Sequence, residues 1–336
     1  MTDLNTKLEI FDAIAARRNE RRGFLRFAGG GALAIGGATL LSACGNDDAD
    51  LAPVPVPGPA PVAALNDADV LNFALNLEYL EAQFYAFATF GVGLNASLLT
   101  GTGTQGGVTG GAQVPFQDPI VREYAREIAI DEIAHVAFLR TALGSAAVAQ
   151  PALDISAGTA AAPGAFTLAA RAAGVVPATG VFNPYADDNS FLLGAYIFED
   201  VGVSAYKGGA ALIANKTYLE AAAGILAAEA YHAGLIRTIL YRKGLTTPSL
   251  RTAAGQISDA RDSLDGSSDI DQGITGTDPN VSNIVPTDAN GLAYSRSVAQ
   301  VHNIVYLTNT AKIGGGFFPN GTNNRTDALR SSGANA

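Results

Sequence analysis

Two short motifs constrain this chain more than any other feature. Glu132-Ile133-Ala134-His135 and Glu229-Ala230-Tyr231-His232 both read Glu-x-x-His within long, Ala-rich apolar segments of helical character. On a helix, residues three apart lie one turn apart on the same face. A carboxylate and an imidazole placed in this way can bind one metal ion together, and two such helices facing each other can hold two ions.

Each motif follows a second, longer pattern. Glu78 and Tyr85 precede the first Glu-x-x-His, and Glu199 and Tyr206 precede the second, and the members of each pair are seven positions apart. A spacing of seven keeps both side chains on one helical face. A single helical Glu is usually a solvated surface charge, and one Glu-x-x-His can arise by chance. The repetition of both patterns in the same order is therefore the specific signal.

Helical periodicity and cap signals predict an all-α four-helix bundle over residues 65–245. The long segment 145–188 is interrupted by prolines and has the length of a crossover between the second and third helices, with a short helix over 165–173. The four predicted helices run from Asn66 or Asp67 to about Phe90, from Asp118-Pro119 to about Leu143, from the segment 187–190 to about Ala214, and from near Thr217 to Lys243-Gly244, with Gly244 as the C′ residue.

Composition limits the alternatives. The chain has 336 residues, 48% hydrophobic and 15% charged, with a net charge of −10. Such a surface repels phosphate backbones, which argues against nucleic-acid binding. Cys44 is the single cysteine, so neither an intrachain disulfide nor a cysteine-based metal site is expected. Two of the three histidines lie in the Glu-x-x-His motifs, and the third, His302, is expected to be structural or exposed.

Residues 1–44 are predicted to be a signal peptide. Arg21-Arg22-Gly23-Phe24-Leu25-Arg26 resembles a twin-arginine export motif, and the uncharged run that follows is too short and weakly apolar for a membrane span. Leu41-Ser42-Ala43-Cys44 resembles a bacterial lipobox, the alternative being a chance cysteine after a simple secretory signal. Residues 45–64, with alternating prolines, form a semi-rigid linker. We expect a periplasmic protein, lipid-anchored to the membrane through Cys44.

Residues 246–336 are predicted to be an extension that packs on the bundle. Helices are expected over 249–264 and 295–310, with a loop over 266–290 and a polar, partly disordered tail from 312. Within the bundle, Gly101 to Gly111 is predicted to be a loop without packing capacity.

The repeated motifs resemble the ferritin-like superfamily. Its members hold two iron or manganese ions in a four-helix bundle, with one Glu from each of two helices and Glu-x-x-His from each of the other two. The closer resemblance is to the desiccation-related ferritin-like proteins of bacteria and plants. It is carried by the segments 71–82, 198–203 and 315–321, and the similarity covers roughly residues 65–322. The implied metal ligands are Glu78, Glu132, His135, Glu199, Glu229 and His232.

At three positions the sequence differs from the ligand set and its surroundings that the resemblance implies. Glu81 lies one turn after Glu78 and could replace it as ligand. Asp200 is adjacent to Glu199 but about 100° round the helix, so it competes less well. Ala228 precedes the second motif where Asp131 precedes the first, so the two halves of the site are expected to differ in outer-shell support.

Carboxylates and imidazoles suit iron or manganese; copper or zinc could also bind. The first hypothesis is an exported protein with two Fe or two Mn ions that reacts with oxygen, peroxide or ferrous iron in envelope stress defence. The second is a non-catalytic, desiccation-associated structural or binding protein. Tyr85 and Tyr206 are the candidate catalytic residues, the alternatives being hydrogen-bond donors to the ligands or core aromatics. A homodimer is compatible with either hypothesis, whereas the anchor, linker and extension would obstruct a closed storage cage.

The predicted export route and lipid anchor can be tested directly. Replacing Arg21 and Arg22 together by Lys should retain the protein in the cytoplasm, because the twin-arginine receptor reads both guanidinium groups. Cys44→Ser should release a soluble periplasmic form, since it removes the atom that would carry the lipid. Cell fractionation measures both. Normal export of the double Lys variant would rule out the twin-arginine route, and unchanged membrane association of Cys44→Ser would rule out the anchor.

Overall fold

The computed structural model describes residues 65–334. The predicted signal peptide, lipobox and linker lie outside these residues. The described chain is mostly helical, as predicted, and none of its helices is both long and apolar enough to cross a membrane.

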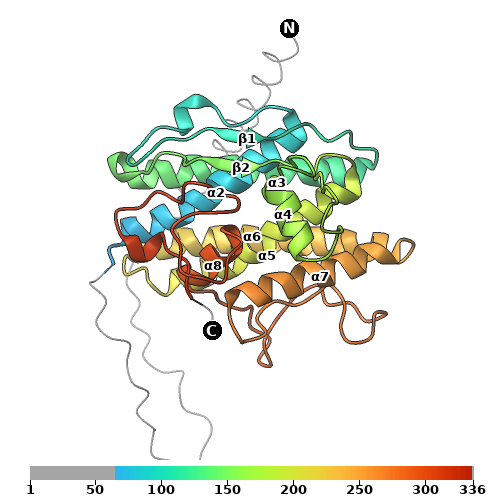
Figure 1. Ribbon diagram of the computed structural model, residues 1–336. Coiled ribbons are helices and arrows are strands. Elements are labelled where there is room, and N and C mark those ends of the chain that lie inside the picture. Colours follow the sequence, from blue (N-terminus) through green and yellow to red (C-terminus); the bar gives the residue numbers. More distant parts are fainter. Residues whose placement is uncertain (1–64, 335–336) are drawn as a thin grey trace, which may run out of the picture. The chain divides into compact units, whose positions relative to one another are not determined.

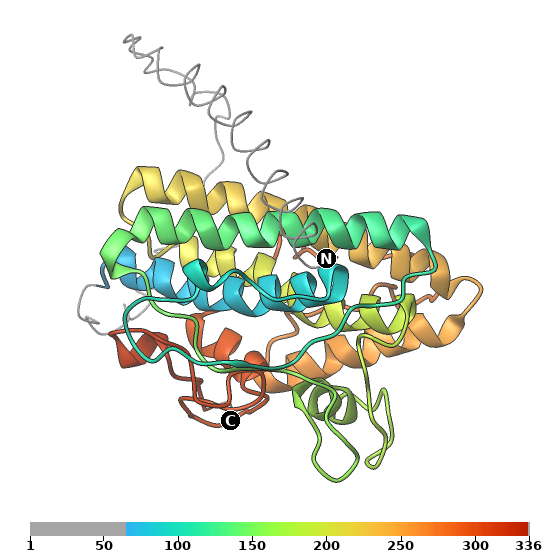
Figure 2. The same ribbon diagram turned by 90° about the horizontal axis from the view of Figure 1, so that it is seen from above.

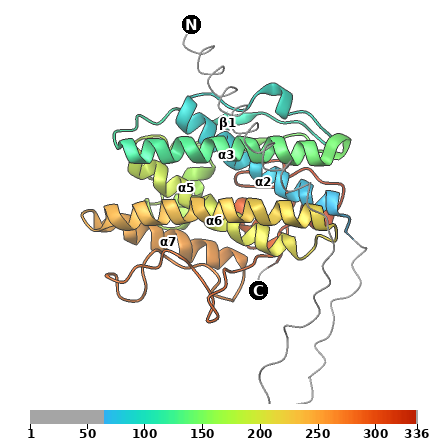
Figure 3. The same cartoon turned by 180° about the vertical axis from the view of Figure 1, so that it is seen from behind.

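Four long helices form the bundle (Figure 1). Helix α2 packs mainly on α3, and α5 mainly on α6, so the bundle consists of two helical pairs (Figures 2 and 3). The four helices are α2 (Asp67–Phe90), α3 (Pro119–Leu143), α5 (Asp188–Ala210) and α6 (Lys216–Gly244).

Local sequence explains where these helices begin. The side chains of Asn66, Asp118, Asp187 and Asn215 each accept a hydrogen bond from a backbone N–H of the first turn of α2, α3, α5 and α6. Two ends differ from expectation. Helix α5 stops at Ala210, because the next turn leaves the helix and donates the N–H groups of Ala214 and Asn215 to Asp67. Gly244 is not a C′ residue but the last residue of α6.

The connection between α3 and α5 carries a short helix, α4 (Ala165–Ala172), as predicted. It also carries β2 (Leu153–Ile155), which pairs in parallel with β1 (Val108–Gly110). The prediction that 101–111 is a loop without packing capacity was therefore wrong. Its glycines allow close backbone approach, since a Cβ on Gly106 would lie 2.2 Å from the backbone nitrogen of Ala152. Two 3-10 turns complete the connections: η1 (Ala96–Leu98) lies between α2 and α3, and η2 (Gly144–Ala146) follows α3.

The C-terminal extension packs on the bundle. Helix α7 (Pro248–Asp265) contacts α5 and α6, and α8 (Val298–Val305) contacts α5 and α7 (Figure 1). Helix α8 is shorter than predicted: a capping box of Ser297 and Gln300 starts it, and Leu307 in a left-handed conformation follows its end. His302 is buried rather than exposed, with its two ring nitrogens against Val298 O and Thr322 Oγ1.

The tail after residue 312, expected to be partly disordered, is packed as far as the structure describes it. Phe317 is fully buried, with its ring 5.2 Å from that of Phe166 and 4.9 Å from that of Phe198. A 3-10 turn, η3 (Asp327–Leu329), closes this region. Asn76 of α2 exchanges two hydrogen bonds with the backbone of Asn323, at 2.8 and 2.9 Å, and so fixes the tail to the bundle.

Asn76→Ala should lower the free energy of unfolding by about 2–4 kcal/mol, because it leaves the partly buried backbone N–H and C=O of Asn323 without these partners. Chemical denaturation of the mature chain would measure this loss. The exposed Asn290, which bonds only within its own loop, provides a control: Asn290→Ala should change stability by less than about 0.5 kcal/mol. Equal stability of the Asn76 variant and the wild type would contradict a fixed tail.

Candidate metal centre

All six predicted ligands point into the interior of the bundle, and each is at most 6% exposed. They come from all four long helices: Glu78 from α2, Glu132 and His135 from α3, Glu199 from α5, and Glu229 and His232 from α6. The geometric part of the sequence prediction, convergence within one bundle, therefore agrees with the structure.

The side chains form two groups, each able to surround one ion. Glu78, Glu132, His135 and Glu229 make one, and Glu199, Glu229 and His232 make the other, with ligand atoms within 4.8 Å of one another in each. Glu229 belongs to both groups.

Glu132 also reaches both histidines. Its Oε1 lies 3.0 Å from His232 Nδ1, and its Oε2 lies 3.6 Å from His135 Nδ1. The two imidazole centroids are 6.2 Å apart. If two ions were bound, Glu132 and Glu229 would therefore be the carboxylates between them, and each imidazole would hold one ion.

The polar atoms of this cluster are close together yet unsatisfied. His135 Nδ1 is 3.2 Å from Glu78 Oε2, but this approach lacks hydrogen-bond geometry. Buried polar atoms ordinarily have hydrogen-bond partners, and buried charges are paired or coordinate metal. The unpartnered atoms are Glu78 Oε2, both carboxylate oxygens of Glu132 and of Glu229, Glu199 Oε2, and Nδ1 of His135 and of His232. These are the donor atoms that a metal pair requires, so the residues fit such a group.

Two tyrosines hold the remaining oxygens. Tyr85 donates its hydroxyl hydrogen to Glu199 Oε1, and Tyr206 donates to Glu78 Oε1. Each tyrosine comes from one half of the repeat and supports the Glu of the other half. Both hydroxyls are buried, and burial together with the nearby carboxylates raises their pKa values well above the ordinary value. In this structure both act as hydrogen-bond donors.

Glu78, rather than Glu81, belongs to the groups of side chains that could hold a metal ion. Glu81 is nevertheless buried, and burial, Glu132 and Glu199 raise its pKa well above the ordinary value. It is a fifth carboxylate near the centre.

Gly202 faces the same space: a Cβ there would lie 2.2 Å from Glu229 Oε2 and 3.4 Å from Glu81 Oε1. Sequence reasoning missed this role, although a glycine inside a helix costs about 1 kcal/mol relative to alanine and so indicates a packing or functional reason.

The outer support of the two histidines is unequal. Asp131 Oδ2 lies 3.5 Å from Nε2 of His232, the ring nitrogen that faces away from the cluster. A carboxylate there orients the ring and increases its basicity. The corresponding position on α6 is Ala228, which offers no carboxylate to His135. The predicted difference between the two halves is thus present.

Protonation follows from burial and mutual repulsion. Burial raises the pKa of Glu78 to about 7 and that of Glu199 to about 8, against the opposing effect of the imidazoles. Burial would also raise the pKa of Glu132, but His135 and His232 hold it well below the ordinary value. Burial lowers the pKa of His232, yet Asp131, Glu132 and Glu199 together raise it to about 10. Without metal, the cluster therefore holds protons on several groups at neutral pH.

These shifts predict how the metal-free protein responds to pH. A carboxyl group whose pKa rises from 4.5 to about 7 or about 8 on folding adds stability below pH 4.5, and that stability is lost as pH rises through the folded value. The melting temperature measured with chelator should thus fall between about pH 4.5 and about pH 8, whereas the metal-loaded protein should not show this fall. Glu78→Gln, which cannot ionise, should flatten the slope. A melting temperature that rises with pH would contradict this account.

Comparison with known proteins places the chain among ferritin-like proteins. The sequence profile of the family described as ferritin-like domain matches residues 66–242. A ferritin-like catalase, Nec2 of Nesocodon mauritianus, is 29% identical over 270 residues, which cover 77% of this chain and 84% of the relative. The desiccation-related protein PCC13-62 of Craterostigma plantagineum is 30% identical over 247 residues, 69% of this chain and 75% of the relative. No solved structure gives a significant match. The chain belongs to the ferritin-like family, in its desiccation-related branch.

Proposed function

We propose that this protein is an exported di-metal protein, with two iron or two manganese ions, that consumes peroxide in envelope stress defence. The observation that carries the proposal is the set of buried, unpartnered carboxylate and imidazole atoms from four helices. Such a nitrogen and oxygen donor set suits iron or manganese. Similarity to a relative named ferritin-like catalase supports peroxide, among small oxidants, as the substrate.

The chain's own residues would divide the work. His135 with Glu78, and His232 with Glu199, would each hold one ion, and Glu132 and Glu229 would lie between the two. When bound, the ions supply the redox chemistry. Tyr85 fixes the orientation of Glu199, and Tyr206 fixes that of Glu78. Each tyrosine keeps its own hydroxyl proton and donates it in the hydrogen bond. The surrounding apolar side chains exclude bulk water, which strengthens each electrostatic contact.

Export is part of the proposal and rests on the sequence alone. The twin-arginine-like segment at Arg21-Arg22 and the lipobox-like Cys44 would place the protein in the periplasm with a lipid anchor. A route that carries folded proteins suits a metal site assembled in the cytoplasm.

A second candidate function is non-catalytic. The similarity to a desiccation-related protein favours a stress-associated structural or binding role that keeps the bundle without turnover. Metal content and peroxide consumption of the purified protein distinguish the two candidates, because only the first requires both.

Glu132→Ala should abolish metal binding and peroxide consumption, since Glu132 reaches both histidines. In the presence of chelator the variant should also melt lower than wild type, because it removes the one carboxylate whose charge both imidazoles stabilise. Metal bound only to the folded wild type should add about 4 kcal/mol at a thousandfold excess over Kd. Elemental analysis, peroxide assays and calorimetry measure these effects.

Glu123→Ala provides a control on the same helix, since Glu123 is exposed and contacts only Arg122 among the described ion pairs. It should retain metal, activity and stability. Wild-type protein that contains no iron or manganese as purified, and melts at one temperature with and without chelator, would overturn the di-metal proposal and favour the inert one.

A further inference from the structure

Helix α5 presents two functional faces. Glu199, Gly202 and Tyr206 face the metal centre. Tyr196, Asp200, Ser204 and Gly208 recur every four residues and so form a second stripe, because four residues return to nearly the same direction at about 100° per residue. Every member of this outer stripe contacts the C-terminal extension. The C-terminal extension therefore contacts the turn of α5 that carries Glu199, on a different side of the helix from the metal centre.

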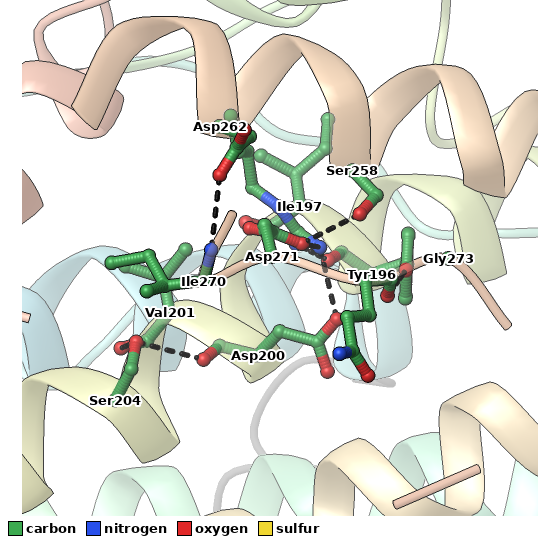
Figure 4. A network of polar contacts seen from close by, with 12 residues as sticks. Tyr196, Ile197, Asp200, Val201, Ser204, Ser258, Asp262, Ile270, Asp271 and Gly273 are labelled. Carbon is green, nitrogen blue, oxygen red and sulfur yellow. Dashed lines mark hydrogen bonds and ion pairs between the residues drawn. The ribbon is translucent and has the colours of Figure 1, made fainter. Parts of the chain in front are cut away.

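Arg261 of α7 makes the most direct of these contacts. Figure 4 shows the surrounding polar network, with Asp200 of α5 and Asp271 of the loop after α7 labelled. Its Nη2 donates to Asp200 Oδ2 at 2.9 Å and to Asp271 Oδ1 at 2.7 Å. Its Nη1 donates to the backbone carbonyl of Tyr196 and, at 3.3 Å, to that of Ile197. One buried guanidinium thus binds both the side chain and the backbone of the turn that leads into Glu199.

Two further arginines, Arg237 and Arg296, bind the same stripe of α5. Together with Arg261 they are called the clamp below. Arg237 of α6 donates to Asp200 Oδ2 at 2.7 Å, and its other Nη donates to carbonyls of the loop after α7. Arg296 donates to Ser204 Oγ at 2.7 Å and to Asp271 Oδ2 at 2.7 Å. Asp265 accepts from Arg296 Nε at 2.6 Å. Three buried arginines therefore face three buried aspartates.

Close backbone contacts leave α5 little freedom. On the outer stripe, a Cβ on Gly208 would lie 1.9 Å from the carbonyl oxygen of Arg296, so the extension touches the helix backbone directly. On the inner face, a Cβ on Gly202 would lie 2.2 Å from Glu229 Oε2. Displacement of α5 in either direction would change the distance between Glu199 and the rest of its group.

We propose that the C-terminal extension is a structural part of the metal centre. Arg261 and Asp271 are positioning residues: through Asp200 they hold the turn of α5 that brings Glu199 close to Glu229 and His232, with which it would hold one ion. The inference rests on the proposed di-metal function. It extends the centre beyond the family profile, which ends at residue 242.

The test uses the mature chain, stripped by chelator and titrated with Mn(II). Arg261→Met combined with Asp271→Asn removes one positive and one negative charge, and leaves Asp200 paired with Arg237 and Asp265 with Arg296. Wild type should bind two ions. The double variant should bind the first ion normally and the second about 10- to 100-fold more weakly, the range typical of lost outer support. Electron paramagnetic resonance of free Mn(II) measures both affinities.

A charge-matched control removes another Arg–Asp pair of the extension. Arg330→Met with Asp327→Asn affects a surface pair that does not contact α5 among the described interactions. Both Mn(II) affinities should remain those of wild type.

A second pair of variants tests the same clamp without changing charge. Gly208→Ala should displace the backbone of Arg296 from α5, because the added Cβ would overlap its carbonyl oxygen, and should weaken binding of the second ion. Gly209→Ala, the adjacent residue, gains the same helix propensity but meets only Val70 Cγ1 at 3.9 Å, so both ions should bind normally.

The outcomes separate the two proposals. Wild type that binds no Mn(II) contradicts the metal centre itself. Wild type that binds two ions, with the Arg261/Asp271 and Gly208 variants binding both at unchanged affinity, overturns the positioning role alone. Parallel loss of both ions, with a lowered melting temperature of the metal-free variants, indicates general destabilisation and also overturns it. Selective weakening of one ion, with metal-free melting unchanged, supports the clamp.

Discussion

The imbalance of buried charge at the centre of the bundle is the constraint on which the rest of the structure depends. Five carboxylates, including Glu81, are buried there with only two imidazoles. Such an arrangement is costly unless protons or cations compensate it. Burial and repulsion shift several of these groups toward their protonated forms when no metal is bound. Metal ions would replace those protons, so metal binding and folding stability are coupled at this site.

The second buried ionic cluster is different in kind. Arg237, Arg261 and Arg296 face three aspartates, so that cluster is balanced by its own residues. It requires no ion, and its directional guanidinium contacts suit a structural role. The two clusters contact different faces of the same helix, α5. An unbalanced site that would bind metal is thus backed by a balanced one that fixes the helix.

The helices and most of the residues of the candidate metal centre could be predicted from the sequence. The repeated Glu and His spacing identified the inward faces of four helices, because helical periodicity and local caps act over a few residues. Asn66, Asp118 and Asp187 cap their helices as their residue types indicate. The choice between Glu78 and Glu81 was not resolved, since both lie on neighbouring turns of one helix and only the packing of α2 against α3 decides between them. A charged residue at the apolar spacing of α7, as Arg261 is, was a readable but overlooked signal.

By itself, the sequence determined the fold class, the helices and the set of ionisable residues that converge, because these follow from local propensity and from patterns within single helices. Only the tertiary structure decided that Tyr85 supports Glu199 and Tyr206 supports Glu78. It also decided that Phe317 packs in the core and that Asn323 binds Asn76. These contacts join residues more than 100 positions apart. Nothing in the local pattern specifies such a pairing, since it depends on how whole helices and the extension pack together in space.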